Sequence, residues 1–467
     1  MGRLSLLEKN AFLSIYANRY GLHATFAYSH YEIDRSYTFN DFTVIDWEND
    51  PVGEYDFWLE YLQKLGDKFE WEFLENSFSK FSMGKVREFE DEGEGVSAIR
   101  FVFDGNLEER SKSINAIHGY FPEVIVEVLD NKKGRDLLSK LAIRLGYRDA
   151  LLIDLNLHKF EIFRSKVNEK TRSANLADIH DKPWDSAHSK ISWDSNRALI
   201  EKLKDARLKA FATVDPEGSV VYNQWANLVC DRYASTSNRN LLDILRSYAT
   251  VQLLSMFNSA KLFDGMGQGQ KPTLLIITGG IPSMLKSDQT YLAILDGLQL
   301  RGSFDVMFSS NYEVFTLADE FIEGVNAKYY IVTLGQITER MERLFAPDIP
   351  GRPEEKKTVF MANITTKGTG EKTVYALASS IANIDLPKEE YVIDGDFVKG
   401  AYIEGGSLLG MSGGEKKSSR KGEGFMWHSA KEKLQIDRIV VDARYKPVVY
   451  GPDYRVNKNK ISSWIGE

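Results

Sequence analysis

The sequence predicts an α/β fold, on three observations. Segments with helical periodicity alternate with short apolar strands between residues 134 and 335, a pattern typical of an α/β sheet rather than an all-α or all-β fold. The 467 residues suffice for two to four domains of about 150 residues each. Hydrophobic side chains make up 43% and aromatic side chains 12%, which supplies apolar cores and excludes disorder of the whole chain.

Each element before residue 346 is assigned from its hydrophobic period. Alternation at every second residue predicts strands, beginning with a β-meander over 11–47, and apolar residues three and four apart predict helices. The further strands expected are Gly95–Phe103, Pro122–Leu129, Ala150–Ile153, Phe160–Phe163, Pro272–Thr278 and Ser303–Phe308. The helices expected are Tyr55–Leu65, Gly134–Gly146, Asn196–Phe211, Leu241–Phe257 and Asp288–Leu300. The polar stretch 166–195 is expected to be a surface excursion.

The pattern of the chain changes after a segment at 347–357 that contains three of its 12 prolines and is the best linker candidate. Short strands follow this segment and predict a C-terminal β domain. They are Val359–Ile364, Thr373–Ala378, Tyr391–Ile393, Ala401–Ile403, Ile439–Val441 and Pro447–Tyr450. The stretch Gly405–Gly424, rich in Gly, Ser and Lys, is expected to be a long mobile loop. The sequence therefore predicts three domains, at 1–149, 150–346 and 357–467.

Charge and composition exclude several classes of function. The net charge of −8 and the pI of about 5.6 argue against a dedicated nucleic-acid-binding protein, which usually contains a basic domain. The single cysteine, Cys230, allows no intramolecular disulfide and no cysteine-based zinc site, and the expected compartment is a reducing cytoplasm. No run of 18 apolar residues predicts a transmembrane helix, and residues 1–10 do not resemble a signal peptide.

Two glycine-rich stretches resemble nucleotide-binding motifs without matching them. In Gly410–Ser418 the lysine does not directly follow the second glycine of a P-loop, and no strong strand precedes it. In Gly265–Gly269 the spacing is wrong for a dinucleotide fingerprint, and the stretch precedes a strand instead of following one. The seven histidines show no paired spacing typical of a metal site. A flexible loop, a turn and solvated side chains are the favoured interpretations.

The most informative stretch is 274–283, where a buried apolar strand ends in Thr278-Gly279-Gly280 and a helix follows. Two glycines at the end of a strand allow a ligand or another backbone segment to approach closely. Upstream, at 152–157, Asp154 lies near the end of a second apolar strand. Together the two strand ends form the candidate site.

These stretches, with the opening segment 13–18, resemble the superfamily of actin, chaperone ATPases and sugar kinases. The segments Ile294–Val306 and Ile439–Pro447 are similar to its MutL-like branch, named for a glutamate-mutase-associated protein. The resemblance implies an actin-like (ribonuclease H-like) fold of two similar α/β lobes that clasp ATP, each opening with a β-hairpin. It makes 1–149 the first lobe, 150–346 the second lobe and 357–467 an added C-terminal β domain.

The resemblance also implies a site for ATP or ADP with magnesium, built from Asp154, Asn156, Thr278, Gly279 and Gly280, with Asp154 at the metal. The sequence departs from the family pattern in both hairpins. Tyr16 and Asn18 replace the aspartate and glycine of the first hairpin, and Asn156 replaces the glycine of the second. Glycine lets backbone N–H groups approach phosphate oxygens, and aspartate positions magnesium. Weak or absent ATP hydrolysis is therefore expected, with some nucleotide binding retained.

Three functions follow from these observations. The first is a degenerate, non-catalytic or weakly nucleotide-binding scaffold or assembly factor with protein partners, and self-association is left open. The second is an active magnesium-dependent ATPase or kinase of the same superfamily, using Asp154, Asn156 and Thr278. The third is a binding module that takes no nucleotide and uses the basic loop 412–424 to contact an acidic partner.

Overall fold

The computed structural model describes the parts of the chain that form its sheets and principal helices. Residues 11–18, 21–30, 33–41, 98–103 and 125–130 are described as strands. The remaining described residues are 145–155, 159–168, 173–183, 206–216, 218, 223, 225, 238–259, 272–309, 341–349, 351, 357–368, 370–398, 401, 415–417, 424–429, 436–450 and 454–464.

The contacts of the chain divide it into two units, each described by itself. Residues Met1–Leu138 and Asn311–Ile337 make the first unit, and Ser139–Ser310 and Thr338–Glu467 make the second. The first unit contains a five-stranded sheet in the order β3-β2-β1-β4-β5. Its strands are β1 (Ala11–Asn18), β2 (Gly21–His30), β3 (Ile33–Asp41), β4 (Ala98–Phe103) and β5 (Ile125–Asp130). The first three pair antiparallel, and β4 and β5 continue parallel to β1.

The second unit contains an eight-stranded sheet in the order β14-β18-β11-β10-β9-β6-β7-β8. Its strands are β6 (Asp149–Leu155), β7 (Lys159–Asn168), β8 (Ser173–Pro183), β9 (Thr273–Thr278), β10 (Gly302–Ser309), β11 (Met341–Ala346), β14 (Ile381–Asp385) and β18 (Ile436–Asp442). Strands β6, β7 and β8 pair antiparallel, and β9 and β10 continue parallel to β6.

The two units therefore repeat one strand order. In each, an antiparallel meander of three strands is followed by two strands parallel to its first strand. This repeat confirms the predicted two-lobed fold, in which each half opens with a β-hairpin. The repeat is seen in the backbone pairing of the strands and does not depend on similar side chains in the two halves.

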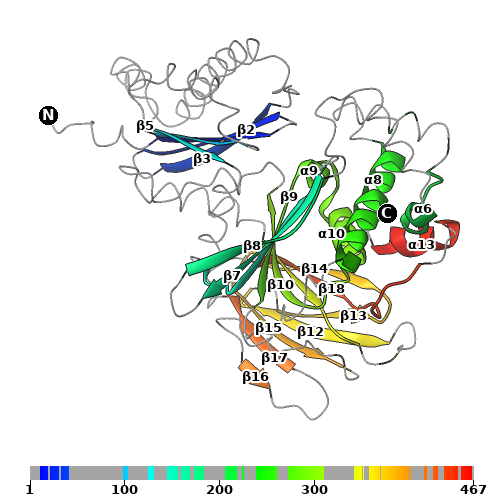
Figure 1. The fold of residues 1–467 in the computed structure, drawn as a ribbon. Helices are drawn as coiled ribbons and strands as arrows, with labels where there is room; N and C mark the ends of the chain where they lie inside the picture. The colour runs from blue at the N-terminus through cyan, green and yellow to red at the C-terminus, as the bar shows by residue number, and fades with distance from the viewer. Residues whose placement is uncertain are drawn as a thin grey trace. The chain divides into compact units, whose positions relative to one another are not determined.

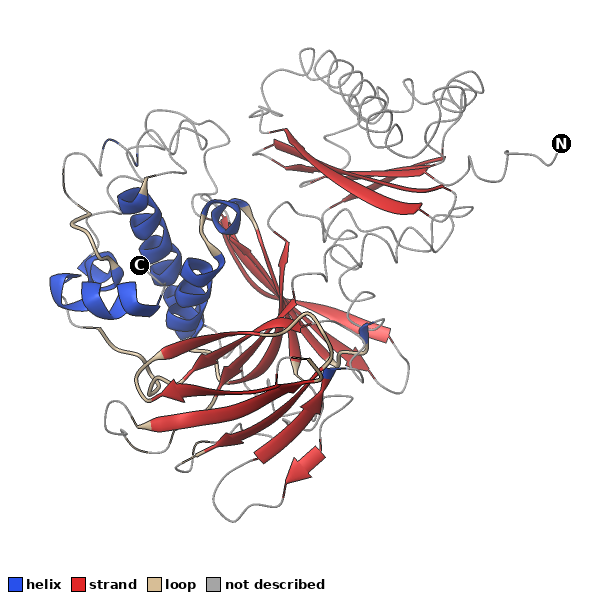
Figure 2. Ribbon diagram, turned by 180° about the vertical axis from the view of Figure 1, so that it is seen from behind, coloured by secondary structure: helices blue, strands red, loops and turns tan. Residues whose placement is uncertain are grey.

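Helices cover one face of the eight-stranded sheet (Figures 1 and 2). They are α6 (Ala206–Phe211), α8 (Arg239–Ser259), α9 (Gly280–Met284), α10 (Ser287–Leu298) and α13 (Tyr454–Trp464). Asn238 caps α8, since its side-chain oxygen accepts hydrogen bonds from the backbone N–H groups of Asn240 and Leu241 at 3.0 and 3.2 Å. Alternate strand residues, among them Leu151 and Ile153 of β6, share one buried core with α8 and α10.

A close approach of α8 and α10 explains one glycine in the segment 294–306. A Cβ at Gly297 would collide with the Cβ of Leu253 and lie 3.0 Å from the backbone oxygen of Thr250. The glycine therefore allows the two helices to pack at this point. Gln299 ends α10 in a left-handed conformation, with φ of 50°.

A second five-stranded sheet covers the other face of the eight-stranded sheet. Its order is β13-β12-β15-β17-β16, from β12 (Thr358–Thr366), β13 (Gly370–Leu377), β15 (Tyr391–Phe397), β16 (Glu415–Lys417) and β17 (Gly424–His428). The ring of Phe345 in β11 lies 6.2 Å from Phe360 and 5.9 Å from Phe397, measured between centroids. The adjacent Leu344 points to the helical core instead, so β11 joins the two layers.

The structure corrects several predicted elements. The predicted surface excursion over 166–195 is wrong at 166–168 and 173–183, because β7 extends to Asn168 and β8 occupies Ser173–Pro183, and its remaining residues lie outside the described part of the chain. The strand over Pro447–Tyr450 is wrong, since these residues form an irregular segment after β18. The loop Gly405–Gly424 contains β16. Strands β14 and β18 come from the range 357–467 but pair within the eight-stranded sheet.

Other predicted elements lie outside the described residues. They are the helix Tyr55–Leu65, all but the end of the helix Gly134–Gly146, the first part of the helix Asn196–Phe211, and the glycine-rich stretch 265–269. None of the helices that are described is long and apolar enough to cross a membrane.

Candidate functional site

The structure brings Asp154 and Thr278 together at the carboxyl ends of two neighbouring strands. Strands β6 and β9 are parallel, and Asp154 is in register with Thr278. Leu155 and Ile153 face the helical core, so the alternation of side chains places Asp154 on the opposite face of the sheet. Thr278 lies on that same face, since Ile277 belongs to the helical core. Asn156 lies outside the described residues.

Glu161 of β7 faces Asp154 across the hairpin. The two residues are register partners, and each is 3% exposed. Register partners on one face of a sheet lie close enough for their side chains to interact. Asp154 and Glu161 each have further interaction partners in the structure. The result is a pair of buried acidic side chains at the predicted phosphate side of the site.

The hydroxyl of Thr278 links the site to the next strand. Its Oγ1 donates a hydrogen bond of 2.6 Å to the backbone oxygen of Ser309, which is its register partner in β10. Both residues are fully buried. Thr278 thereby joins the ends of β9 and β10.

Gly279 has a structural explanation within the chain itself. Its φ is 114°, a conformation that residues with a side chain rarely adopt. A Cβ there would lie 2.6 Å from the backbone nitrogen of Leu155 and collide with the backbone oxygen of the same residue. Gly280, the first residue of α9, accepts a hydrogen bond of 2.7 Å from Ser283 Oγ. The glycine turn therefore lets the start of α9 approach the end of β6.

The side chains at this site could bind magnesium only together with further oxygen ligands from a bound nucleotide. Within the described residues no three side chains of His, Cys, Asp or Glu are grouped to hold a metal ion. Asp154 and Glu161 supply two carboxylates, and magnesium in nucleotide sites is commonly held by one or two carboxylates together with phosphates and water. The pair fits a magnesium ion that a nucleotide brings with it.

A second polar cluster lies on the same face and was not predicted. Arg343 Nε donates to Asp305 Oδ1 at 2.7 Å, and Arg343 Nη2 donates to Asp305 Oδ2 at 3.1 Å. The hydroxyl of Tyr147 donates to Asp305 Oδ2 at 2.7 Å, and the Arg343 guanidinium lies 4.6 Å from the ring centroid of Trp427. In the sequence, the sign of this cluster is a charged residue within each of two otherwise apolar strands, Asp305 in β10 and Arg343 in β11. It is a buried ion pair between the two sheets.

A third buried polar cluster joins the segments 294–306 and 439–447. Arg444 Nη1 donates to Asp296 Oδ1 at 2.6 Å, and Arg444 Nε donates to Asp442 Oδ1 at 2.6 Å. Lys446 Nζ donates to Asp442 Oδ2, and the hydroxyl of Tyr450 donates to Asp296 Oδ2 at 2.9 Å. Two cations and two carboxylates thus balance inside the protein, as a buried ionic group requires.

The electrostatics of this network follow from burial and pairing. Burial by itself would raise the pKa of Asp442, but Arg444 and Lys446 more than offset it and lower that pKa to about 2. Burial lowers the pKa of Lys446, and Asp442 offsets this only in part. Burial and the neighbouring Asp296 raise the pKa of the Tyr450 hydroxyl well above its usual value. Asp442 is therefore ionised at neutral pH, and the whole network is shielded from solvent.

Comparison with known proteins shows no family for this chain. No family model matches the sequence, and no curated protein matches it. Among solved structures, the ethanolamine utilization protein EutJ from Carboxydothermus hydrogenoformans is 8% identical at a TM-score of 0.34, over 66% of this chain and 87% of its own. A Bacteroides thetaiotaomicron protein of unknown function with an actin-like ATPase fold is 8% identical at a TM-score of 0.28. The match covers 68% of this chain and 100% of that protein's chain.

A third similar structure is the activator of 2-hydroxyisocaproyl-CoA dehydratase from Clostridium difficile, with bound ADPNP. It is 11% identical at a TM-score of 0.32, over 71% of this chain and 97% of its own. Scores this low carry no argument about function. The actin-like fold rests on the repeated strand order of the two units.

Proposed function

We propose that this protein is an actin-like scaffold or assembly factor that binds nucleotide weakly or not at all and does not turn it over. The observation that carries the proposal is the packing of Gly279 against Leu155, because it gives the glycine turn a role in the fold that needs no nucleotide. A second support is the composition of the two hairpin turns. The sequence supplies Arg19-Tyr20 between β1 and β2, with Gly21 only after them, and Asn156–His158 without a glycine between β6 and β7.

The chemistry of phosphoryl transfer explains why these turns matter. Transfer of a γ-phosphoryl group requires metal and backbone donors acting together at the phosphate. A turn without glycine keeps a Cβ where the phosphate would meet backbone N–H groups. Asp154, with Glu161 beside it, is the residue that would hold magnesium if a nucleotide brought it. Bound magnesium would supply charge neutralisation at the phosphates.

Calorimetry and a hydrolysis assay test this proposal together. Purified protein is titrated with ATP and ADP, with and without magnesium, and phosphate release is followed on the same preparation. Asp154→Ala is compared with Asp149→Ala, which removes the same group from the other end of β6. We expect millimolar or weaker affinity, equal with and without magnesium, and no hydrolysis above that of Asp154→Ala.

The opposite result would establish the active ATPase or kinase. Hydrolysis that Asp154→Ala abolishes and Asp149→Ala retains would overturn the scaffold proposal. Magnesium-dependent binding at micromolar concentration that disappears in Asp154→Asn would do the same. The geometry that would favour this outcome is the register of Asp154 with both Thr278 and Glu161.

A further inference from the structure

Strand β13 lies at the edge of the five-stranded sheet. It pairs with β12 on one side, and in the described part of the sheet no strand pairs with its other side. Six of its eight residues are exposed. An edge strand presents backbone N–H and C=O groups that a further strand can pair with. The adjacent segment β14 turns away into the eight-stranded sheet.

Exposed apolar side chains gather around this edge. Tyr375 and Leu377 of β13 are 52% and 40% exposed, and Tyr445 is 42% exposed. The bend after β13 is tied to the segment before Tyr445, because Ser379 N donates to Ala443 O and Ala443 N donates to Ser380 O, each at 2.9 Å. Large exposed apolar groups that come together at one place indicate an interaction surface.

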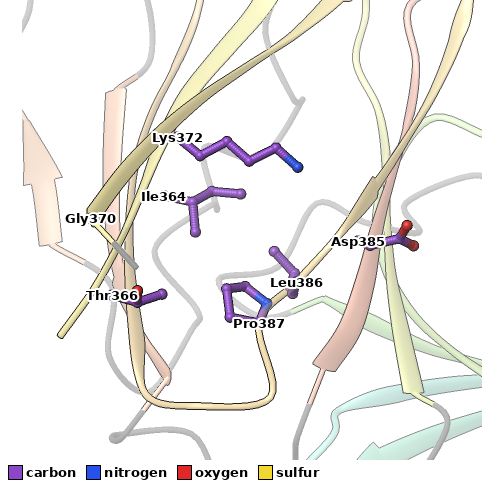
Figure 3. Close-up of a pocket in the computed structure, with 7 residues that line it drawn as sticks. All are labelled: Ile364, Thr366, Gly370, Lys372, Asp385, Leu386 and Pro387. Carbon is purple, nitrogen blue, oxygen red and sulfur yellow. The ribbon is translucent and has the colours of Figure 1, made fainter. Parts of the chain in front are cut away.

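A pocket of about 260 Å³ opens on the other face of β13 (Figure 3). Its walls come from two segments: Ile364, Thr366, Gly370 and Lys372 on β12 and β13, and Asp385, Leu386 and Pro387 at the end of β14. Figure 3 shows the Lys372 side chain extending along the pocket and the Asp385 carboxylate directed away from it. Lys372 makes no ion pair with any described residue, so it offers a positive charge at this edge.

We propose that β13 binds an extended acidic segment of a partner protein as an added β-strand. The backbone of that segment pairs with the open edge, and its side chains alternate between the two faces of the sheet. Acidic side chains on one face meet Lys372, and apolar side chains on the other meet Tyr375 and Leu377. Main-chain hydrogen bonds thereby provide affinity, and the pocket and the apolar flank provide selectivity.

A second copy of this chain fits the edge less well. Two antiparallel β13 strands related by a two-fold axis would place equal faces of the strand side by side. The face of β13 that carries Lys372 carries Gly370, Val374 and Ala376 as well, and none of these is acidic. A symmetric pair would therefore bring no carboxylate to the two lysines. Charge complementarity selects a different, acidic partner.

This inference rests on the assembly role proposed above and identifies where a partner binds. Its test uses no nucleotide, so the proposal about nucleotide and the proposal about β13 can fail independently of each other.

Peptide binding by the full-length protein tests the inference. The probe is a fluorescein-labelled peptide of alternating glutamate and valine, about ten residues long and so able to span β13. A second peptide carries lysine in place of glutamate. We expect fluorescence anisotropy to show at least about tenfold tighter binding of the acidic peptide. Hydrogen exchange should slow at β13 when that peptide is bound.

Charge reversal on the protein completes the experiment. Lys372→Glu should weaken binding of the acidic peptide by about tenfold or more and strengthen binding of the basic peptide, a reversal that misfolding cannot produce. Lys460→Glu, an exposed lysine on α13, is the matched control and should change neither affinity. Equal affinity for the two peptides, or no response to Lys372→Glu, would overturn the proposal. So would a dimer in analytical ultracentrifugation that Tyr375→Glu dissociates, because β13 would then be occupied by a second copy.

Discussion

Arg444 donates a hydrogen bond of 2.6 Å to Asp296, a residue 148 positions earlier in the sequence. Asp296 lies on α10 and Arg444 follows β18, so the contact joins the helical layer to the strand that ends beside it. The ring of Trp464 on α13 lies 4.8 Å from the Arg444 guanidinium and brings the last helix into the same network. The segments 294–306 and 439–447 thus meet in a buried ionic network.

Asp442 is the centre of this network, and its removal should destabilise the protein strongly. Asp442→Asn leaves Lys446 without its carboxylate partner in a buried position. Breaking a buried ion pair typically costs about 3–5 kcal/mol. We expect a loss of that size in the free energy of unfolding measured with urea. Asp437→Asn makes the same change on the same strand at a half-buried position and should cost less than about 1 kcal/mol. Equal losses in the two variants would contradict this role of Asp442.

Acid should weaken the protein through the same carboxylate. The pKa of Asp442 is lowered from 3.8 to about 2, so on acidification the unfolded chain takes up this proton first. The contribution to stability is complete above the unfolded pKa and is lost as the pH falls through the folded one. Its size is about 2 kcal/mol, from 1.36 kcal/mol per pKa unit. Urea unfolding at about pH 5 and about pH 2.5 should show most of this loss in the natural protein, because pH 2.5 still lies above the folded pKa.

The control for the acid effect is Asp442→Asn. Between these two pH values its stability should change by about 1–2 kcal/mol less than that of the natural protein, since the titrating group is absent. If Asp442→Asn loses as much stability on acidification as the natural protein, other carboxylates cause the loss and the prediction is wrong.

Gly279 provides a direct test of whether the glycine turn serves the fold. Gly279→Ala forces a Cβ into the backbone of Leu155 and requires a φ of 114° from an alanine. We expect a destabilisation of about 2–4 kcal/mol, measured by thermal or urea unfolding. Gly218→Ala is the matched control, because a Cβ there meets its nearest neighbour, Asp215 O, at an ordinary 3.4 Å. If Gly279→Ala is as stable as Gly218→Ala and loses only nucleotide binding, the turn serves a ligand.

Local periodicity was enough to find the elements next to the candidate site. The predicted strand Pro272–Thr278, helix Asp288–Leu300 and strand Ser303–Phe308 correspond to β9, α10 and β10 within two residues at each end. The apolar residues of these elements are buried, so the spacing of apolar residues in the sequence indicates which segments are strands and which are helices. The pairing of Asp154 with Thr278 could likewise be expected, because parallel neighbouring strands end at one edge of a sheet.

Long-range pairing explains what the sequence could not reveal. Strand β8 has few alternating apolar residues, and its structure depends on pairing with β7. Strand β14 resembles its neighbours in the C-terminal sheet but pairs with β18 in the eight-stranded sheet. The partners of Arg343 and Arg444 come from distant segments, and a local pattern contains no information about them. No local pattern marks Glu161 as the register partner of Asp154.

The last prediction contrasts a buried ion pair with an exposed one. Asp305 pairs with Arg343 between two sheets at 4% and 2% side-chain exposure, whereas Asp348 pairs with Arg301, which is 51% exposed. Asp305→Asn leaves a buried arginine facing a neutral group, and we expect a loss of about 3–5 kcal/mol in the free energy of unfolding. Asp348→Asn should cost less than about 1 kcal/mol, because solvent screens an exposed pair. Tyr147→Phe removes the 2.7 Å hydrogen bond to Asp305 and should cost about 1 kcal/mol. If Asp305→Asn costs no more than Asp348→Asn, solvent reaches the space between the two sheets and screens the Asp305–Arg343 pair.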